Sequence, residues 1–139
     1  MIAPKEPKPT PVQERRAYEL VTGRDGGVCQ KCLRHCGPAN RDHRKDRSVG
    51  GLTLVSNQQL LGGSGTTGCH GWKTTHPKAA QLTGWAVPGW ADPREYPAAR
   101  WMSTTYGTVR LAWVLYDDMG TWVEISEDEA FRRMEGRAV

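Results

Sequence analysis

The sequence has few of the residues from which a conventional hydrophobic core is built. Only one of its 139 residues is Phe, and hydrophobic residues make up 37% of the chain. Six Trp and four Tyr must supply much of the remaining apolar bulk. A chain of this length predicts one compact domain. Because so small a domain buries a modest share of its surface, a structural metal is a natural source of additional stability.

Two further absences bear on location. No apolar run is long enough to cross a membrane, and the first residues do not resemble a secretory signal. We therefore expect a soluble, cytoplasmic protein with no membrane partner. The chain has only four Cys, and in a reducing compartment these predict metal binding or catalysis rather than disulfides.

The positive charge is concentrated at the front of the chain. Residues 1–50 carry eleven Lys/Arg against six Asp/Glu, whereas residues 101–139 carry four against seven, and the whole chain has a net charge of +4. A basic N-terminal region favours DNA binding, because neutralising the DNA phosphates releases their counterions. Simple solubility is the alternative explanation.

Local signals predict a flexible basic arm over residues 1–9 and a single domain over residues 10–139. Thr10, Pro11 and Gln13 form a helix-start pattern with a capping box, and glycines at 23 and 26–27 end that helix. Leu60 and Leu61 predict the end of a short buried strand.

In the second half of the domain, the sequence predicts a helix, an irregular segment, two strands and a last helix. Helical composition covers residues 72–82, with Pro77 as a kink or a start and Gly84 as the C-terminal cap. Residues 85–105 predict an irregular segment, and residues 108–116 and 121–125 a pair of strands. Ser126 and Glu129 predict the start of a last helix.

Cys29 and Cys32 stand in a C-x-x-C turn, the spacing at which two thiolates can share a tetrahedral zinc. A redox pair would need an alternating α/β pattern around it, which this sequence does not have. Unliganded thiols are the third possibility.

Two histidine-containing pairs carry the remaining chemistry. Asp42-His43 places a ligand for a hard metal ion beside a general base. Cys69-His70 places a thiol that suits the zinc next to a second candidate metal ligand. Taken alone, the first pair also fits a solvated charged loop and the second a surface histidine.

Together these residues resemble HNH endonucleases of actinobacterial phages and their hosts. The resemblance rests on Asp42-His43-Arg44, Gly50-Gly51, Ser56-Asn57, Leu60-Leu61 and, most specifically, the stretch GSGTTGCHGW from Gly63 to Trp72. It implies an α+β protein with a small ββα-metal (His-Me finger) core at about residues 28–84, a preceding helix and a C-terminal antiparallel hairpin.

The resemblance also implies roles for individual residues. His43 is the general base that activates water, Asp42 and His70 are ligands of a catalytic divalent ion, and Asn57 holds the loop and orients the base. An open site of this kind suits Mg²⁺ or Mn²⁺ and also accepts Ni²⁺ or Zn²⁺. We expect Arg44, Lys45 and Arg47 to contact the DNA backbone, for which a solvated basic loop is the alternative.

The pattern departs from the family at Gly62, where a cysteine is usual. The expected structural zinc therefore keeps Cys29, Cys32 and Cys69, with Cys36 as the substitute fourth ligand. Without a fourth ligand the zinc site is open, weak or empty.

The sequence thus predicts a metal-dependent endonuclease that nicks or cuts duplex DNA with little sequence preference, as a monomer or homodimer. The resemblance implies a link to phage genome processing or packaging in the host cytoplasm, with the phage terminase as a partner. Two alternatives remain: a non-catalytic zinc-binding DNA-binding module and a zinc-ribbon-like protein-interaction domain.

Overall fold

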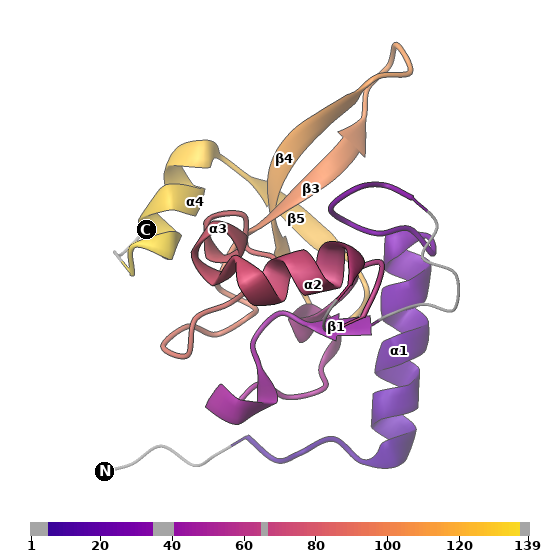
Figure 1. Ribbon diagram of the computed structural model, residues 1–139, viewed down its shortest axis with the longest axis vertical. Helices are drawn as coiled ribbons and strands as arrows, with labels where there is room; N and C mark the ends of the chain where they lie inside the picture. Colours follow the sequence, from indigo (N-terminus) through magenta and orange to yellow (C-terminus); the bar gives the residue numbers. More distant parts are fainter. Residues whose placement is uncertain (1–5, 35–40, 65–66, 137–139) are drawn as a thin grey trace.

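The structure is a computed structural model that describes residues 6–34, 41–64 and 67–136. Over these residues the chain is a small α+β protein with two antiparallel sheets, which confirms the predicted class (Figure 1). The elements, in order, are α1 (Pro11–Asp25), β1 (Arg41–His43), the 3₁₀ helices η1 (Arg47–Val49) and η2 (Val55–Asn57), β2 (Gln58–Leu60), α2 (Gly68–Thr75), α3 (Pro77–Leu82), β3 (Ala98–Ser103), β4 (Val109–Tyr116), β5 (Trp122–Ile125) and α4 (Glu127–Met134).

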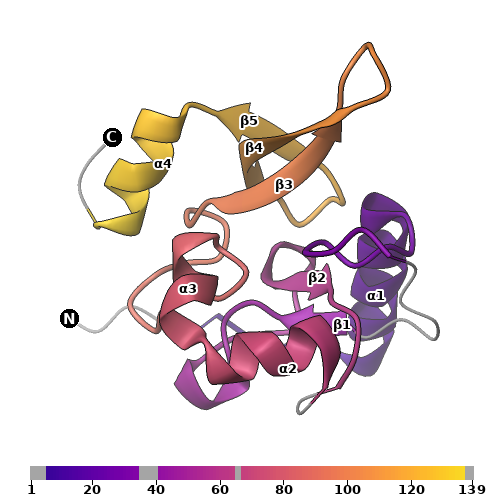
Figure 2. The ribbon, with the colours of Figure 1, turned by 45° about the horizontal axis from the view of Figure 1, so that its top comes forward.

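The smaller sheet is a short antiparallel pair that lies between two helices. In β1 and β2, Asp42 is paired with Gln59 and His43 with Gln58. Helix α1 packs against one side of this pair and α2 lies along the other (Figure 2). Strand β1 therefore lies beside an element from a later part of the chain (Figure 2).

The caps of the first and last helices confirm the sequence predictions. The Thr10 hydroxyl accepts a hydrogen bond from the Gln13 backbone N–H, and the Gln13 side chain accepts one from the Thr10 N–H. Gly26 then ends α1 in the left-handed conformation that glycine adopts most easily (φ 63°). At α4 the Ser126 hydroxyl accepts from the Glu129 N–H, as expected of an N-cap.

Pro77 divides the predicted helix over residues 72–82 into two. Helix α2 begins earlier, at Gly68, and ends at Thr75, and Pro77 is the first residue of α3. Gly84 follows α3 with a positive φ of 71°, and a Cβ there would lie 1.8 Å from the Pro97 carbonyl oxygen. A side chain at this position is excluded, so the chain can turn closely onto the segment before β3.

The prediction of an irregular segment over residues 85–105 is wrong at its end. Ala98–Ser103 forms β3, which pairs with β4 along its whole length, so the predicted hairpin is a three-stranded sheet in the order β3-β4-β5. This strand begins with two alanines and an arginine rather than β-branched residues. It is specified by its partner strand more than by its own composition.

Part of the N-terminal arm lies against the domain. The Glu6 carboxylate accepts two hydrogen bonds from the Arg94 guanidinium, at 3.2 and 2.9 Å. Residues 1–5, the rest of the predicted arm, lie outside the described residues. Among the helices of the described ranges, none is long and apolar enough to cross a membrane.

Candidate functional site

Asp42 is the centre of a group of polar side chains between β1 and α2. Its carboxylate is buried, and Oδ1 lies 3.1 Å from Nε2 of His70. The other oxygen, Oδ2, accepts hydrogen bonds from Gln59 Nε2 at 2.9 Å and from Lys73 Nζ at 2.7 Å. Strand β1 thus directs Asp42 toward the helix that carries both His70 and Lys73.

His70 is held by the first turn of α2. Its backbone N–H donates to the Gly62 carbonyl at 2.9 Å, which ties the helix start to the end of the preceding loop. Its side-chain Nδ1 is buried and has no hydrogen-bond partner among the described residues. The imidazole therefore makes its polar contact through the nitrogen that faces Asp42.

The two groups shift each other's titration in the directions of an ion pair. The hydrogen bond with Asp42, opposed by partial burial, raises the pKa of His70 above its ordinary value. Burial alone would raise the pKa of Asp42, but the hydrogen bond from His70 and the charge of Lys73 outweigh it and lower that pKa.

The same pair is suited to hold a divalent cation. Oxygen and nitrogen ligands lie roughly 2.0–2.2 Å from small divalent ions, so two ligands at a right angle are about 3 Å apart. The observed separation of 3.1 Å between Asp42 Oδ1 and His70 Nε2 fits this requirement. A metal-bound imidazole usually donates its other N–H to a carboxylate, a carbonyl or water, and among the described residues Nδ1 of His70 has no such partner.

His43 is adjacent to Asp42 on β1 but makes different contacts. It is half-buried, and its Nε2 lies 2.9 Å from the hydroxyl of Thr53. Burial, and then the positive charge of Arg47, lower the pKa of His43 below its ordinary value. The imidazole is therefore neutral at pH 7, the form in which it can accept a proton.

Asn57 joins the two ends of the loop that follows β1. Its Oδ1 accepts from the Lys45 backbone N–H at 2.7 Å, and its Nδ2 donates to the carbonyls of Lys45 at 3.0 Å and Leu52 at 2.9 Å. Its own carbonyl accepts from the Arg44 N–H, one residue beyond His43. This buried amide thus fixes the backbone beside His43, consistent with the loop-holding role expected of it.

The structure corrects the prediction that Arg44 contacts DNA. Arg44 is 1% exposed, and its guanidinium donates to backbone carbonyls, among them those of Ser56, Gly84 and Tyr96 at 2.9 Å each. A guanidinium enclosed in this way is not available to a phosphate. Lys45 is half-buried, with Nζ 3.0 Å from the Ala91 carbonyl, whereas the Arg47 side chain is 65% exposed.

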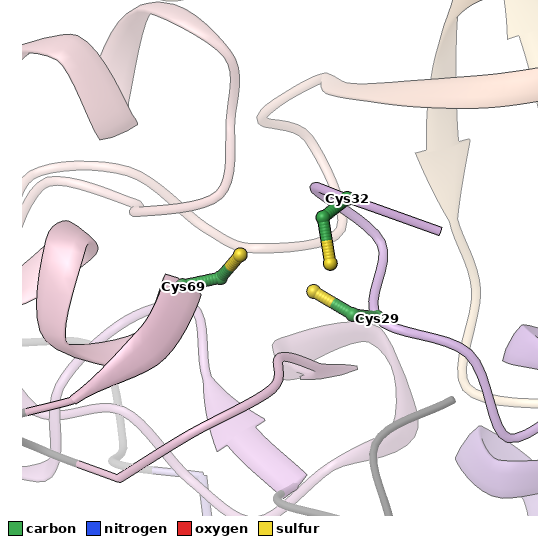
Figure 3. Close-up of side chains that lie close together, drawn as sticks. All are labelled: Cys29, Cys32 and Cys69. Carbon is green, nitrogen blue, oxygen red and sulfur yellow. The ribbon is translucent and has the colours of Figure 1, made fainter. Parts of the chain in front are cut away.

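Three cysteines form a second candidate metal site. The Sγ atoms of Cys29, Cys32 and Cys69 all lie within 4.8 Å of one another (Figure 3). Cys29 and Cys32 come from the turn after α1, and Cys69 from the start of α2. Three thiols at this spacing could bind a metal such as zinc. Cys36, the expected fourth ligand, lies outside the described residues.

The electrostatics of these thiols favour a cation. Burial would raise the pKa of Cys29, but backbone N–H groups, that of Gly62 foremost, lower it below its ordinary value. Burial and the neighbouring thiols raise the pKa of Cys69 to about 12. Three thiolates so close together repel one another, and a bound cation would remove this cost.

Gly62 lies beside the cysteines. A Cβ built at this position would be 3.9 Å from Cys29 Cβ and 4.0 Å from its Sγ. A cysteine side chain at this position would therefore begin next to the thiol cluster.

Three polar residues of the site were not predicted from the sequence: Thr53, Gln59 and Lys73. Lys73 had a usable signal, because it follows His70 at the i+3 spacing that places two side chains on one helical face.

Comparisons of the chain with protein-family models, with curated proteins and with solved structures find no match.

Proposed function

We propose that this protein is a metal-dependent HNH endonuclease that hydrolyses phosphodiester bonds in DNA, on a ββα-metal core made of β1, β2 and α2. The observation that carries the proposal is the 3.1 Å separation of Asp42 Oδ1 and His70 Nε2 across the strand–helix junction. A carboxylate and an imidazole in this arrangement leave most positions around a divalent ion open to water and phosphate.

In this proposal each residue of the site has a separate task. Asp42 and His70 hold the divalent ion, preferably Mg²⁺ or Mn²⁺, which when bound stabilises negative charge on the phosphate oxygens. His43 takes a proton from the attacking water, for which its neutral state is required. Asn57 keeps the loop after His43 in place through its contacts with Lys45 and Leu52.

Lys45 and Arg47 remain as contacts to the DNA backbone. Arg47 has the more accessible side chain, and contacts of this kind position DNA without reading its sequence. We therefore propose low sequence preference. A role in phage genome packaging, with the terminase as a partner, rests on the family resemblance alone.

The three cysteines support a structural zinc in the same proposal. Cys69 and His70 are neighbours in the first turn of α2, so a zinc on Cys29, Cys32 and Cys69 would fix the backbone that carries His70. A displacement of about 1 Å in a catalytic group can cost on the order of 10²-fold in rate.

One observation favours a second candidate, a non-catalytic zinc-binding module that binds DNA. The carboxylate of Asp42 is paired with Lys73 at 2.7 Å, so its charge is balanced by the protein itself. A binding module could use this ion pair as a purely structural contact between β1 and α2.

Plasmid cleavage separates the two candidates. Zinc-loaded protein is incubated with supercoiled plasmid and Mg²⁺, Mn²⁺ or EDTA, beside His43→Ala and Asp42→Ala variants. The nuclease converts plasmid to nicked or linear forms only with the divalent ion, and both variants lose this activity. Plasmid that is bound but left intact by the wild type would instead identify the binding module.

A further inference from the structure

Lys73 is a buried cation at the centre of the proposed metal site. It is 8% exposed, and Nζ lies 2.7 Å from Asp42 Oδ2 and 2.6 Å from the His43 carbonyl oxygen. Lys73 therefore contacts both the metal-binding carboxylate and the backbone of the proposed base, and no sequence motif assigned it a role.

The contacts of Lys73 determine which oxygen of Asp42 remains available. Gln59 and Lys73 both donate to Oδ2, whereas Oδ1 faces His70. Gln59 is itself fixed by a 2.6 Å hydrogen bond to the Trp85 carbonyl. Asp42 is thus oriented for ligation through Oδ1 alone.

Lys73 also removes the negative charge that would attract a cation. The charges of Asp42 and Lys73 offset each other at 2.7 Å, and a neutral His70 adds none. Asp46 also acts on His70, but less than Asp42 and Lys73 do. A divalent ion bound here would therefore leave about two uncompensated positive charges in a partly buried site, which is unfavourable until an anion arrives.

We propose that Lys73 makes metal binding dependent on the substrate, so that the divalent ion and a DNA phosphate bind cooperatively. Without DNA, Lys73 keeps the affinity for the ion low. The phosphodiester supplies the missing negative charge and so raises that affinity. By linkage, the ion raises the affinity for DNA by the same factor. This inference rests on the proposed nuclease function and adds the regulation of the same site.

The test measures Mn²⁺ affinity by isothermal titration calorimetry of zinc-loaded protein, with and without a short DNA duplex. All proteins carry His43→Ala, which prevents cleavage and leaves the backbone carbonyl that Lys73 contacts. Asp42→Ala removes the proposed metal ligand, so the binding heat that this variant loses is the heat of Mn²⁺ binding at this site. Lys73→Met removes the charge, and Lys73→Gln removes it while keeping a hydrogen-bond donor. Lys78→Met, which removes an exposed charge from α3, is the matched control.

We expect the duplex to tighten Mn²⁺ binding by at least about tenfold in the protein with Lys73, within the usual range for coupled sites. Lys73→Met or Lys73→Gln should bind Mn²⁺ about tenfold more tightly without DNA and lose most of the effect of the duplex. Lys78→Met should behave like its parent.

Two results would overturn the inference, and they are distinguishable. If DNA leaves Mn²⁺ affinity unchanged, or if neither charge-removing variant binds the ion more tightly without DNA, the coupling through Lys73 is wrong. If Asp42→Ala leaves Mn²⁺ binding intact, the metal is not at this site and the proposed function fails with it.

Discussion

Replacing Arg44 with lysine should destabilise the protein although it preserves the charge of the chain. The Arg44 guanidinium is enclosed and donates to carbonyls from separate segments, including Ser56 and Gly84 at 2.9 Å and Pro93 and Tyr96 at 2.9 Å. It thereby joins β1 to the segment that leads into β3. Burial lowers the pKa of Arg44 to about 10, which still leaves it charged at neutral pH.

The magnitude follows from the geometry of the two side chains. A planar guanidinium presents donors along three edges, whereas the lysine ammonium is a single point that cannot reach carbonyls on all sides. At least two buried carbonyls would lose their partner, at a cost of about 1–3 kcal/mol each. The expected loss is therefore roughly 2–6 kcal/mol. At about 3 °C per kcal/mol, the melting temperature should fall by about 6–18 °C.

The assay is thermal unfolding of zinc-loaded protein by circular dichroism, together with the salt dependence of DNA binding. Arg47→Lys is the matched control, because this exposed position should change stability by no more than about 0.5 kcal/mol. The reasoning fails if Arg44→Lys melts within about 2 °C of the wild type. A drop in DNA affinity alone would return Arg44 to the role of a phosphate contact.

Three further predictions concern the metal sites and the loop. Gly62→Cys, whose Cβ would lie 4.0 Å from Cys29 Sγ, should slow zinc transfer to a chelator by about tenfold or more, whereas Gly62→Ser should not. Without divalent ions, the raised pKa of His70 contributes stability below about pH 6.5 that is lost as pH rises through its folded pKa. The lowered pKa of Asp42 contributes stability that is lost only in stronger acid. The lowered pKa of His43 opposes the effect of His70, so in a His43→Ala background melting should peak at mildly acidic pH, and adding His70→Asn should abolish the decline at higher pH. Asn57→Ala should lower stability by about 2–4 kcal/mol and abolish plasmid cleavage, and an unchanged melting curve would contradict the loop-holding role.

Local signals in the sequence were sufficient to predict the starts of α1 and α4, but not the start of α2 or the strand β3. Thr10 and Ser126 cap their helices through contacts with residues three positions away, so nearby residues in the sequence are enough to predict where these helices begin. Strand β3 depends instead on pairing with β4, in which Ala98 is opposite Val114. It begins with two alanines, a residue type depleted in strands, so pairing with the distant partner is needed to select the extended conformation.

Residues of the candidate site could be predicted where adjacent residue types indicate a function, and not where their role depends on contacts with distant parts of the chain. The pairs at 42–43 and 69–70 could be found by residue type, but the sequence could not say which basic neighbour is buried. Alternation held a clue, because Asp42 on β1 and Arg44, the first residue after β1, are two positions apart and both buried, whereas His43 between them is only half-buried. Lys73 was missed because its partner lies on another element.

The buried arginines connect parts of the fold that the few apolar residues leave as separate clusters. The described hydrophobic residues form small separate clusters, one around Val21 and Leu60 and another around Val114 and Tyr116. Between these two clusters, Arg24 donates to the Gln58 carbonyl at 2.6 Å and its guanidinium lies 3.8 Å from the Tyr116 ring centroid. Such contacts are directional, unlike apolar packing, and they tie β2 to both α1 and the larger sheet. The hairpin that carries Asp42 is therefore held by directional hydrogen bonds, which is what the proposed metal site, with ligands about 3 Å apart, would require.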